Sequence, residues 1–387
     1  MGNFNSLEIW YRGWGFIGKV DSPLSENVEW GNFKIKDIFE IQSYKKRFDA
    51  NKVDILQSGR YPYVVRMGAN NGQKGYINEE EKFLNEGNTI SFGQDTATMF
   101  YQEIPYFTGD KIKILKSKDN CFNKYNAQYF ITCMAKAFSS FSWGNNSFSI
   151  EIIGNQEILL PTKDHKVDFN FIEKSTAKIE AEHLAKVEKY LIRNSMYDTK
   201  LKDDEKRALD TFQDQKLCKF KLKDLFNNIV QGRRLKKEDH ISGNLPFVMA
   251  GITNTGVVNY IGNDVNVFPK NSITVDIFGN VFYRNLKYGL GDDTGAYWNT
   301  DIEIDRKAIL YLSTAMQKFL NGKFDYGNKL RSSQSLNFEI TLPVGLDSRP
   351  DYKFMENYIS AIEKLTIKRL ISYLDDKKSR LVEWLQD

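Results

Sequence analysis

The sequence predicts an α+β protein built from two tandem modules of mixed α and β structure, each followed by a long helix. Three observations predict this fold: blocks that recur in the same order in both halves, strand-like runs that open each half, and amphipathic helical patterns that close each half. The expected segments are an N-terminal extension (1–32), a first module (33–167), a first helix with a connector (168–219), a second module (220–347) and a second helix (348–387).

Seven blocks of the first half recur in the second half. The first block reads FKIKDIF at 33–39 and FKLKDLF at 220–226, with the same charges and conservative apolar exchanges. The other matches are 61–64 with 245–248, 75–77 with 259–261, 88–90 with 271–273, 141–145 with 324–328, 158–161 with 340–343, and 168–173 with 351–356. A repeat of about 185 residues is far longer than a solenoid unit, so each copy is expected to be a domain. Residues 1–32 have no visible counterpart before the second copy.

The first part of each module is predicted to be rich in strands. Residues 89–92 and 273–278 are short β-branched and aromatic runs, and turns rich in Gly and Asn separate such runs. Both modules therefore follow one plan, in which strands come first and a helix comes last.

The last part of each half is predicted to be a long amphipathic helix. Asp351 is the expected N-cap of the second helix, in which apolar residues recur at spacings of three and four. The pattern fits one helix of about 30 residues, or two helices with a break near Asp375 and Asp376. Asp168 opens the first helix, which at roughly 28 residues would be about 42 Å long. Neither module can bury such an apolar stripe fully, so we expect the helices to pack together as an antiparallel coiled coil with pseudo-two-fold symmetry.

The charged segment 198–219 is expected to connect the halves, partly as helix.

Composition narrows the class of protein. The 387 residues carry 54 Lys and Arg against 50 Asp and Glu, a net charge of +4, which does not by itself predict a nucleic-acid partner. The three cysteines are scattered without metal or disulfide spacing, and no stretch is apolar enough to span a membrane. The sequence therefore predicts a protein of the reducing cytoplasm, with no metal site and no membrane partner.

Two motifs resemble enzyme elements, and the sequence around them argues against both. Residues 13–20 (GWGFIGKV) fit a nucleotide-binding glycine pattern, but a proline-containing turn at 21–23 follows where a helix should begin. Asp305 and Lys307 resemble the Asp-x-Lys element of a restriction-type nuclease, but the apolar run after them indicates that Asp305 caps a helix. Only three histidines occur, far apart, so neither a metal site nor a catalytic triad is predicted.

Two modules held apart by helices suit a protein that reads DNA. Dimeric DNA readers contact half-sites about 34 Å apart, close to the predicted helix length. Each module has a basic loop near its start, which is suited to phosphate contacts. After 61–64 or 245–248 each module also has a loop rich in hydrogen-bonding side chains, which is suited to base edges. The candidate DNA-binding residues are Lys45, Lys46 and Arg47; Arg66, Asn70, Asn71, Gln73 and Lys74; Arg233, Arg234, Lys236 and Lys237; Thr253, Asn254 and Thr255; and Asn328, Lys329 and Arg331, with Asn145 as a further phosphate contact. Any one cluster can equally be an ordinary solvated loop or turn, and it is the recurrence at matched places that favours DNA. Because the two sets of loops differ, we expect a bipartite, asymmetric target.

The duplicated plan resembles a known family. Each copy ends in Ile-x-Leu-Pro, and the second continues with residues 350–359 (PDYKFMENYI) and a long helix. These features are similar to the specificity (S) subunits of type I restriction–modification systems and of the related BcgI-like type IIB systems, from Phe33 to the end of the chain. The resemblance implies that the modules are target recognition domains and that the helices are spacers that dock methyltransferase subunits.

The same resemblance implies a chain without catalysis of its own. Double-stranded DNA and DNA methyltransferase subunits would be its partners, together with a restriction/translocase subunit where one is used. No cofactor is expected on this chain, because S-adenosylmethionine would sit on the partner methyltransferase. Residues 162–163 and 344–345 depart from the proline and Glu-Gln that follow Leu-Pro in many type I members, so both system types stay open. A fused restriction–methylation enzyme, a nuclease using Asp305 and Lys307, and a scaffold that never meets DNA are the alternatives.

Overall fold

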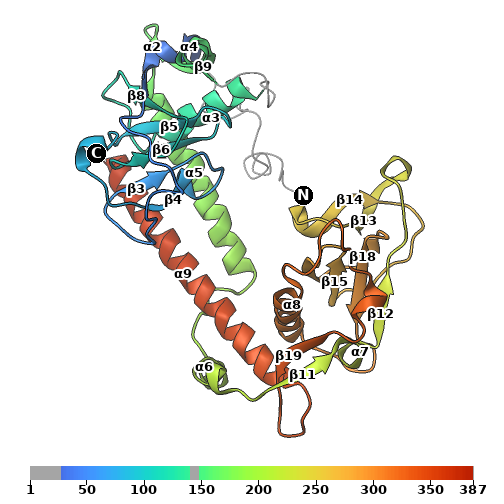
Figure 1. Ribbon diagram of the computed structural model, residues 1–387. Helices are drawn as coiled ribbons and strands as arrows, with labels where there is room; N and C mark the ends of the chain where they lie inside the picture. The colour runs from blue at the N-terminus through green and yellow to red at the C-terminus, as the bar shows by residue number, and fades with distance from the viewer. Residues whose placement is uncertain (1–27, 140–147, 387) are drawn as a thin grey trace. The chain divides into compact units, whose positions relative to one another are not determined.

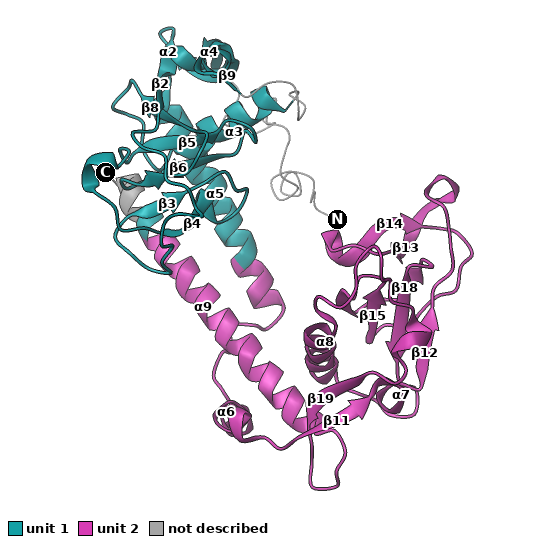
Figure 2. Cartoon of the chain, viewed as in Figure 1, with its two compact units in different colours: residues 1–187, 380–387 teal, residues 188–379 magenta. Residues whose placement is uncertain are grey.

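The computed structural model describes residues 28–139 and 148–386. The chain divides into two compact units, one of residues 1–187 with 380–387 and one of residues 188–379 (Figure 2). Each unit holds one strand-rich module together with parts of the two long helices (Figure 1). The glycine motif at 13–20 and the block at 141–145, with Asn145, lie outside the described residues.

The first module contains two main sheets. Its strands are β1 Glu29–Lys34, β2 Phe39–Ser43, β3 Pro62–Val64, β4 Gln73–Tyr76, β5 Thr89–Gly93, β6 Met99–Gln102, β7 Phe107–Thr108, β8 Ile112–Ser117, β9 Glu157–Lys163 and β10 Lys166–Val167, and its helices are α2 Ile35–Ile38, α3 Ala127–Phe138 and α4 Ile150–Asn155. The larger sheet is antiparallel with the order β2-β8-β5-β6. The smaller sheet has the order β4-β3-β7, in which β3 and β7 are parallel. A separate antiparallel pairing joins β9 to β1 and β10.

The second module repeats this topology. Its strands are β11 Leu217–Lys221, β12 Asn228–Gln231, β13 Ser242–Val248, β14 Val257–Ile261, β15 Ser272–Asp276, β16 Val281–Arg284, β17 Gly289–Leu290, β18 Thr294–Trp298 and β19 Glu339–Pro343, and its helices are α7 Leu222–Leu225 and α8 Arg306–Leu320. The larger sheet has the order β12-β18-β15-β16 and the smaller sheet the order β14-β13-β17, again with one parallel pair. The repeated strand order confirms the predicted tandem duplication.

The repeat begins earlier in each copy than the sequence blocks indicate. β1 pairs with β9 in the same way that β11 pairs with β19, so residues 29–32, assigned to the extension, have a counterpart at the start of β11. Most side chains of these two edge strands are exposed or only partly buried. At 29–32 the strand is defined by backbone pairing rather than by burial, and these residues share no side-chain pattern with 217–219.

Helices α3 and α8 cover the larger sheet of their own modules. In the first module Phe92 of β5 packs in one buried cluster with Phe130 and Met134 of α3. In the second, Tyr297 of β18 packs with Met316 of α8. All residues of β5 and β15 are buried, which explains why these strands read as continuous apolar runs rather than alternating ones.

One matched block recurs for a conformational reason. Asn88 and Asn271 stand just before β5 and β15 with φ of 51° and 56°, in the left-handed region that Asn tolerates better than most residues. The Asn88 amide donates to Phe122 O at 3.0 Å, and the Asn271 amide donates to Ile304 O at 2.8 Å. A hydrogen bond from the Asn side-chain amide thus closes the equivalent turn in both modules.

The two long helices are α5 Phe169–Arg193 and α9 Tyr352–Gln386. The carboxylates of Asp168 and Asp351 each accept a hydrogen bond at 2.9 Å from the backbone N–H three residues on. This confirms Asp351 as the predicted N-cap and shows the same cap at Asp168. α9 runs through Asp375 without a break, so the alternative of two shorter helices is wrong. The connector contains the short helix α6 Asp203–Asp210, so it is partly helical as expected.

Candidate nucleic-acid interface

The basic loop of the first module lies beside its smaller sheet. Lys45, Lys46 and Arg47 are exposed between β2 and β3. Arg47 forms a backbone bridge with Thr108 at the end of β7, and Thr108 is paired with Val64, the last residue of β3. The loop is therefore adjacent to the point where the chain leaves β3.

The basic loop of the second module occupies the same position. The backbone N–H of Arg233 donates to Leu290 O at 3.0 Å at the end of β17, and Leu290 is paired with Val248, the last residue of β13. Arg233 and its basic neighbours Arg234, Lys236 and Lys237 are all exposed. In both modules the structure thus brings the predicted basic loop next to the start of the predicted polar loop.

The polar loops after β3 and β13 share an uncommon backbone. They form the short turns η1 Asn70–Gly72 and η5 Thr253–Gly256. In η1 both Asn residues have left-handed φ values of 49° and 53°, and in η5 Asn254 and Thr255 have 49° and 52°. Two successive non-glycine residues in this region are rare, and here they occur at equivalent places in two copies. The matched loops therefore present their side chains from the same backbone shape.

Side-chain amides stabilise this shape. The amide of Asn70 donates to Gln73 O at 2.8 Å, and the amide of Asn254 donates to Val257 O at 3.2 Å. Asn71 donates to Tyr101 O at 3.0 Å. These amide donors hold the turns, so the three Asn residues have a structural role in addition to any contact with DNA. Among the remaining candidates, Gln73 is half-buried, whereas Lys74, Thr253 and Thr255 are exposed.

Arg66 is paired within the first module. Its guanidinium forms an ion pair with Asp95, and Lys111 Nζ lies 3.0 Å from the same carboxylate oxygen. Because one carboxylate is shared by two cations, this group of three side chains carries a net positive charge. Lys111 was not among the predicted residues, because it is far from Arg66 in the sequence and only the fold brings them together.

The third candidate group divides into two. Arg331 donates from Nη1 to Asp292 O at 2.7 Å, shortly after the end of β17, and thereby joins the region of the basic loop. Asn328 donates from its backbone N–H to the Asp325 carboxylate at 2.9 Å, which closes a turn that ends directly before Lys329. This bond confirms that the block at 324–328 is a turn.

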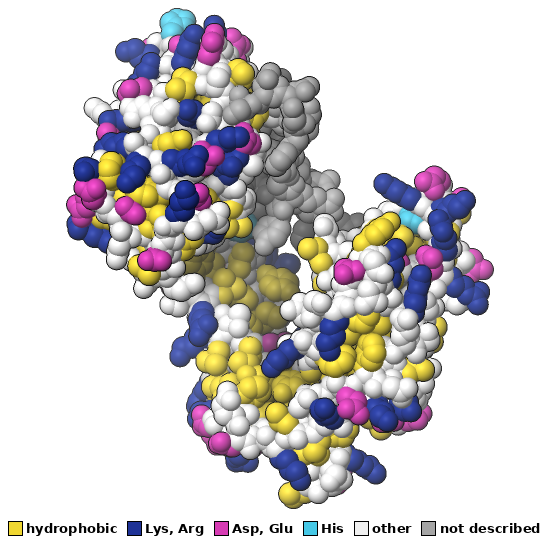
Figure 3. All heavy atoms as spheres, viewed as in Figure 1, with side chains coloured by type: hydrophobic (Ala, Val, Ile, Leu, Met, Phe, Trp, Pro, Cys, Tyr) yellow, Lys and Arg dark blue, Asp and Glu magenta, His cyan; other side chains and the backbone are white. Residues whose placement is uncertain are grey.

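The surface of the second module near β13 and β14 is rich in cations. Figure 3 shows Lys and Arg side chains gathered over this part of the molecule. Ile252, Val258 and Tyr260, on the polar loop and on β14, are large exposed hydrophobic side chains. A surface that combines cations with exposed apolar groups suits phosphates together with base edges, including the thymine methyl group.

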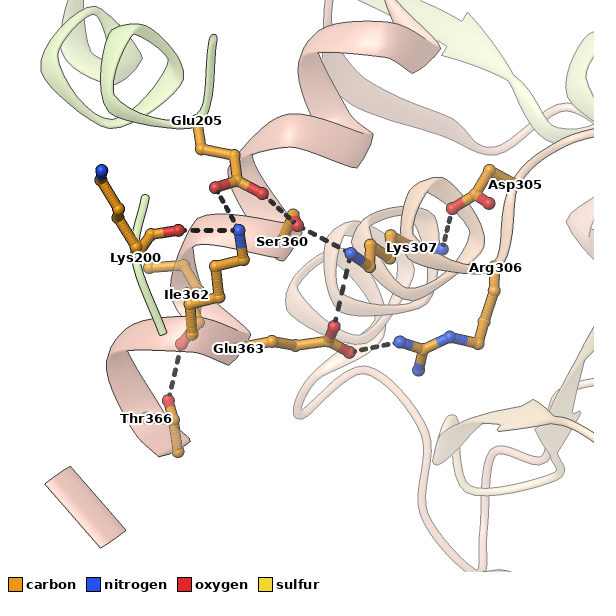
Figure 4. A network of polar contacts seen from close by, with 10 residues as sticks. Lys200, Glu205, Asp305, Arg306, Lys307, Ser360, Ile362, Glu363 and Thr366 are labelled. Atoms are coloured by element: carbon orange, nitrogen blue, oxygen red, sulfur yellow. Dashed lines mark hydrogen bonds and ion pairs between the residues drawn. The ribbon is translucent and has the colours of Figure 1, made fainter. Parts of the chain in front are cut away.

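The nuclease-like Asp305 and Lys307 belong to a network of structural contacts (Figure 4). The Asp305 carboxylate accepts from the backbone N–H of Lys307 at 2.7 Å and caps α8, as predicted. Lys307 Nζ instead donates to Ser360 Oγ of α9 at 2.7 Å and lies 3.8 Å from Glu363. Arg306 lies 2.7 Å from the other oxygen of Glu363. The two side chains of the motif therefore serve different contacts, one within α8 and one between α8 and α9.

The same network holds the connector helix α6 on α9. Glu205 of α6 is buried and accepts from Ser360 Oγ at 2.7 Å and from Lys364 Nζ at 2.8 Å. It also accepts from the backbone N–H of Lys202 at 2.7 Å. Phe212 stacks on Tyr358 with ring centroids 4.3 Å apart. A charged connector is thus fixed in place by one buried carboxylate.

Within residues 28–139 and 148–386, no group of three or more His, Cys, Asp or Glu side chains is placed to hold a metal ion. No helix in this part of the chain has both the length and the apolar character needed to cross a membrane.

Comparison with known sequences decides the family. The sequence model of the type I restriction modification DNA specificity domain matches residues 27–189 and, a second time, residues 215–372. The chain belongs to this family. The first match covers the first module and most of α5, and the second covers the second module and the first part of α9. The repeated unit is therefore the DNA specificity domain.

Individual relatives agree with this assignment. The chain is 28% identical over 349 residues, 88% of its own length and 97% of the relative's, to the type II restriction enzyme specificity subunit S.BcgI of Heyndrickxia coagulans. The crystal structure of a type I restriction–modification S subunit from M. genitalium has a TM-score of 0.52 and 16% identity, and the match covers 93% of this chain and 94% of that one. The structural match is a likeness of fold. Together with the DNA specificity family, these relatives confirm the resemblance to specificity subunits that the sequence predicted.

Proposed function

We propose that this specificity subunit reads a bipartite, gapped DNA target, one half with each module (33–167 and 220–347). The observation that carries the proposal is the repeated surface. In both modules a basic loop lies beside β7 or β17, next to a left-handed polar loop that follows β3 or β13. Equivalent frameworks with different loop side chains are what two different half-sites require. The cations supply phosphate contacts, and the polar loops face the base edges.

The long helices are proposed to form an antiparallel coiled coil with pseudo-two-fold symmetry. Within the second unit, Glu188 of α5 forms an ion pair with Lys378 of α9 and accepts from Tyr197 OH at 3.1 Å. The hydrogen bond from Lys378 holds the pKa of Glu188 below its ordinary value, so this contact is ionic at neutral pH. Three of the buried residues of α5 stand seven positions apart, as a coiled-coil seam requires. They are Ala177, Leu184 and Leu191.

The outer faces of these helices are proposed to recruit DNA methyltransferase subunits and, where one is used, a restriction/translocase subunit. On α5 Tyr190 and Ile192 are 59% and 61% exposed, and on α9 Tyr373 is also exposed. Large apolar side chains at exposed positions of a helix are typical of a surface that a partner covers. The chain itself is proposed to be non-catalytic, with S-adenosylmethionine bound by the partner, and the structural contacts of Lys307 support this view.

The proposal is tested with the full chain in complex with the methyltransferase subunits of its host. Sequencing of modified bases in the host DNA, together with protection footprinting on random duplexes, should return one gapped consensus with two protected segments. A complex that protects no such consensus would defeat the proposal. The isolated chain should show neither methyl transfer nor metal-dependent cleavage, and an activity abolished by Lys307→Ala would favour the enzyme alternative.

Replacing Arg233 and Arg234 with Ala should weaken binding to every DNA sequence. Loss of two phosphate contacts should reduce the slope of log affinity against log salt by about one to two. Fluorescence anisotropy on specific and random duplexes over a salt series measures both effects. The control replaces Lys219 and Lys223, exposed cations on β11 and α7, with Ala. An unchanged slope in the Arg233 and Arg234 variant would remove these residues from the interface.

A further inference from the structure

In each module a buried polar side chain reaches from the edge of the larger sheet to the polar loop. In the first module it is Gln102, the last residue of β6, which is 4% exposed. In the second it is Arg284, the last residue of β16, which is 6% exposed. The two positions are equivalent, because Gln102 lies opposite the first residue of β5 and Arg284 opposite the first residue of β15.

The hydrogen bonds of these side chains also correspond. Gln102 donates from Nε2 to Asn71 O and to Ser91 Oγ, both at 3.1 Å. Arg284 donates from Nη2 to Thr255 O at 2.6 Å and from Nε to Thr274 Oγ1 at 2.8 Å, and its Nη1 lies 3.2 Å from Thr255 Oγ1. Ser91 and Thr274 are each the third residue of their strand. The loop carbonyl in each case belongs to the second left-handed residue, directly before a glycine.

These bonds act where the loop backbone needs support. A left-handed conformation is unfavourable for non-glycine residues, and especially for a β-branched one such as Thr255. A buried donor on the inner side of the loop fixes the carbonyl of that residue and therefore the peptide plane. The exposed side of the loop then has one defined shape.

The donor itself differs between the modules, although its target does not. Gln102 is neutral, whereas Arg284 is a cation that makes no ion pair among the described residues and lies over the rings of Phe282 and Tyr288. Burial lowers the pKa of Arg284 to about 10, which still leaves it charged at neutral pH. Because a neutral and a charged side chain make the same two contacts, the feature that the copies share is the hydrogen bond to the loop carbonyl. The charge is not shared.

We propose that Gln102 and Arg284 are positioning residues for sequence specificity, each holding the polar loop of its own module in the conformation that reads DNA. The inference rests on the proposed function, since it assigns a role within the same interface. Neither residue is expected to contact DNA, because both are buried beneath the loop. Each should control discrimination at one half of the target only.

The test uses the full chain in complex with the methyltransferase subunits and the target identified from modified host DNA. Arg284→Met removes the donors and keeps the length of the side chain, whereas Arg284→Gln installs the donor of the other module. Affinities are measured for the cognate duplex and for duplexes changed in the first or the second half only. Arg284→Met should lose about tenfold or more in discrimination at one half while it keeps discrimination at the other. Arg284→Gln should retain most of it.

A third variant covers the case in which Arg284→Met fails to fold. Gln102→Leu removes a neutral donor from the first module and should lower discrimination at the opposite half. Salt slopes should stay at the wild-type value in all three variants, because no phosphate contact is removed. Full discrimination in folded Gln102→Leu and Arg284→Met, or a slope reduced by about one in Arg284→Met, would overturn the positioning role. If the wild-type complex shows no gapped consensus, the proposed function fails instead.

Discussion

Replacing Glu205 with Ala should destabilise the second unit by about 3 to 5 kcal/mol, because removal of one partner from a buried ion pair leaves the other charge unpaired. Lys364 is mostly buried, and its ammonium group would keep only the backbone carbonyl of Lys200, at 3.0 Å. Ser360 would lose the same carboxylate. Denaturant unfolding measures the free energy, and hydrogen exchange of α6 should show faster exchange throughout that helix.

Asp204→Ala is the matched control for this experiment. Asp204 lies beside Glu205 on α6, but its side chain is exposed and forms an ion pair with Arg207 one turn away. An exposed pair of this kind contributes at most about 1 kcal/mol. Equal unfolding free energies for Glu205→Ala and Asp204→Ala would show that the buried carboxylate does not fasten the connector.

The Glu205 contact should also make stability depend on pH. Burial by itself would raise the pKa of Glu205, but hydrogen bonds from Lys364, the Lys202 backbone and Ser360 outweigh burial and lower the pKa to about 2. Because the folded pKa lies below the unfolded one, the stabilisation is complete above about pH 5 and is lost as the pH falls through the ordinary Glu range toward 2. The difference in unfolding free energy between wild type and Glu205→Gln should therefore shrink between about pH 5 and about pH 3. A constant difference would assign the stabilisation to other groups.

The sequence could predict those parts of the fold that depend on local patterns. Strands at 89–92 and 273–278 were predicted because β-branched and aromatic runs stood between turns. β5 occupies the first position, and β15 occupies the second but ends at Asp276, where the chain turns. The cap Asp351 was recognised because an acidic residue preceded the helical pattern. The single long α9 was not distinguished from two helices, because Asp375 and Asp376 weaken the apolar pattern without ending the helix.

The composition of the interface depended on contacts between distant residues. The sequence predicted basic and polar loops at matched positions. It did not predict the backbone contacts that join Arg47 to Thr108 and Arg233 to Leu290. Gln102 was not predicted, because its polar side chain acts from beneath the loop and no spacing in the sequence indicates that contact. Long-range pairing is therefore the information that the local patterns lacked.

Replacing Gly232 with Ala should remove much of the DNA affinity of the second module. Gly232 opens the basic loop, and its backbone N–H donates to Thr294 O at 2.9 Å. An added Cβ would lie closer to the carbonyl oxygens of Leu290 and Gly291 than atoms can approach, and neither oxygen can rotate away because both belong to the backbone. Overpacking of this kind costs about 1 to 3 kcal/mol and shifts the local backbone. The shifted backbone would displace Arg233, the next residue of the basic loop.

Gly345→Ala, after β19 and outside both proposed DNA-binding loops, provides the comparison that separates a steric effect from a change in chain flexibility. A Cβ at Gly345 would lie 3.2 Å from the flexible end of the Asp347 side chain and 3.8 Å from Arg349 O, so this variant should unfold and bind DNA as the wild type does. Gly232→Ala should lower the melting temperature and the affinity for all duplexes, and it should reduce discrimination at one half-site only. If both alanine variants bind DNA equally well, then the close approach of Gly232 to the β17 end does not set the position of the basic loop. The matched placement of basic and polar loops would then lose its physical basis in the second module.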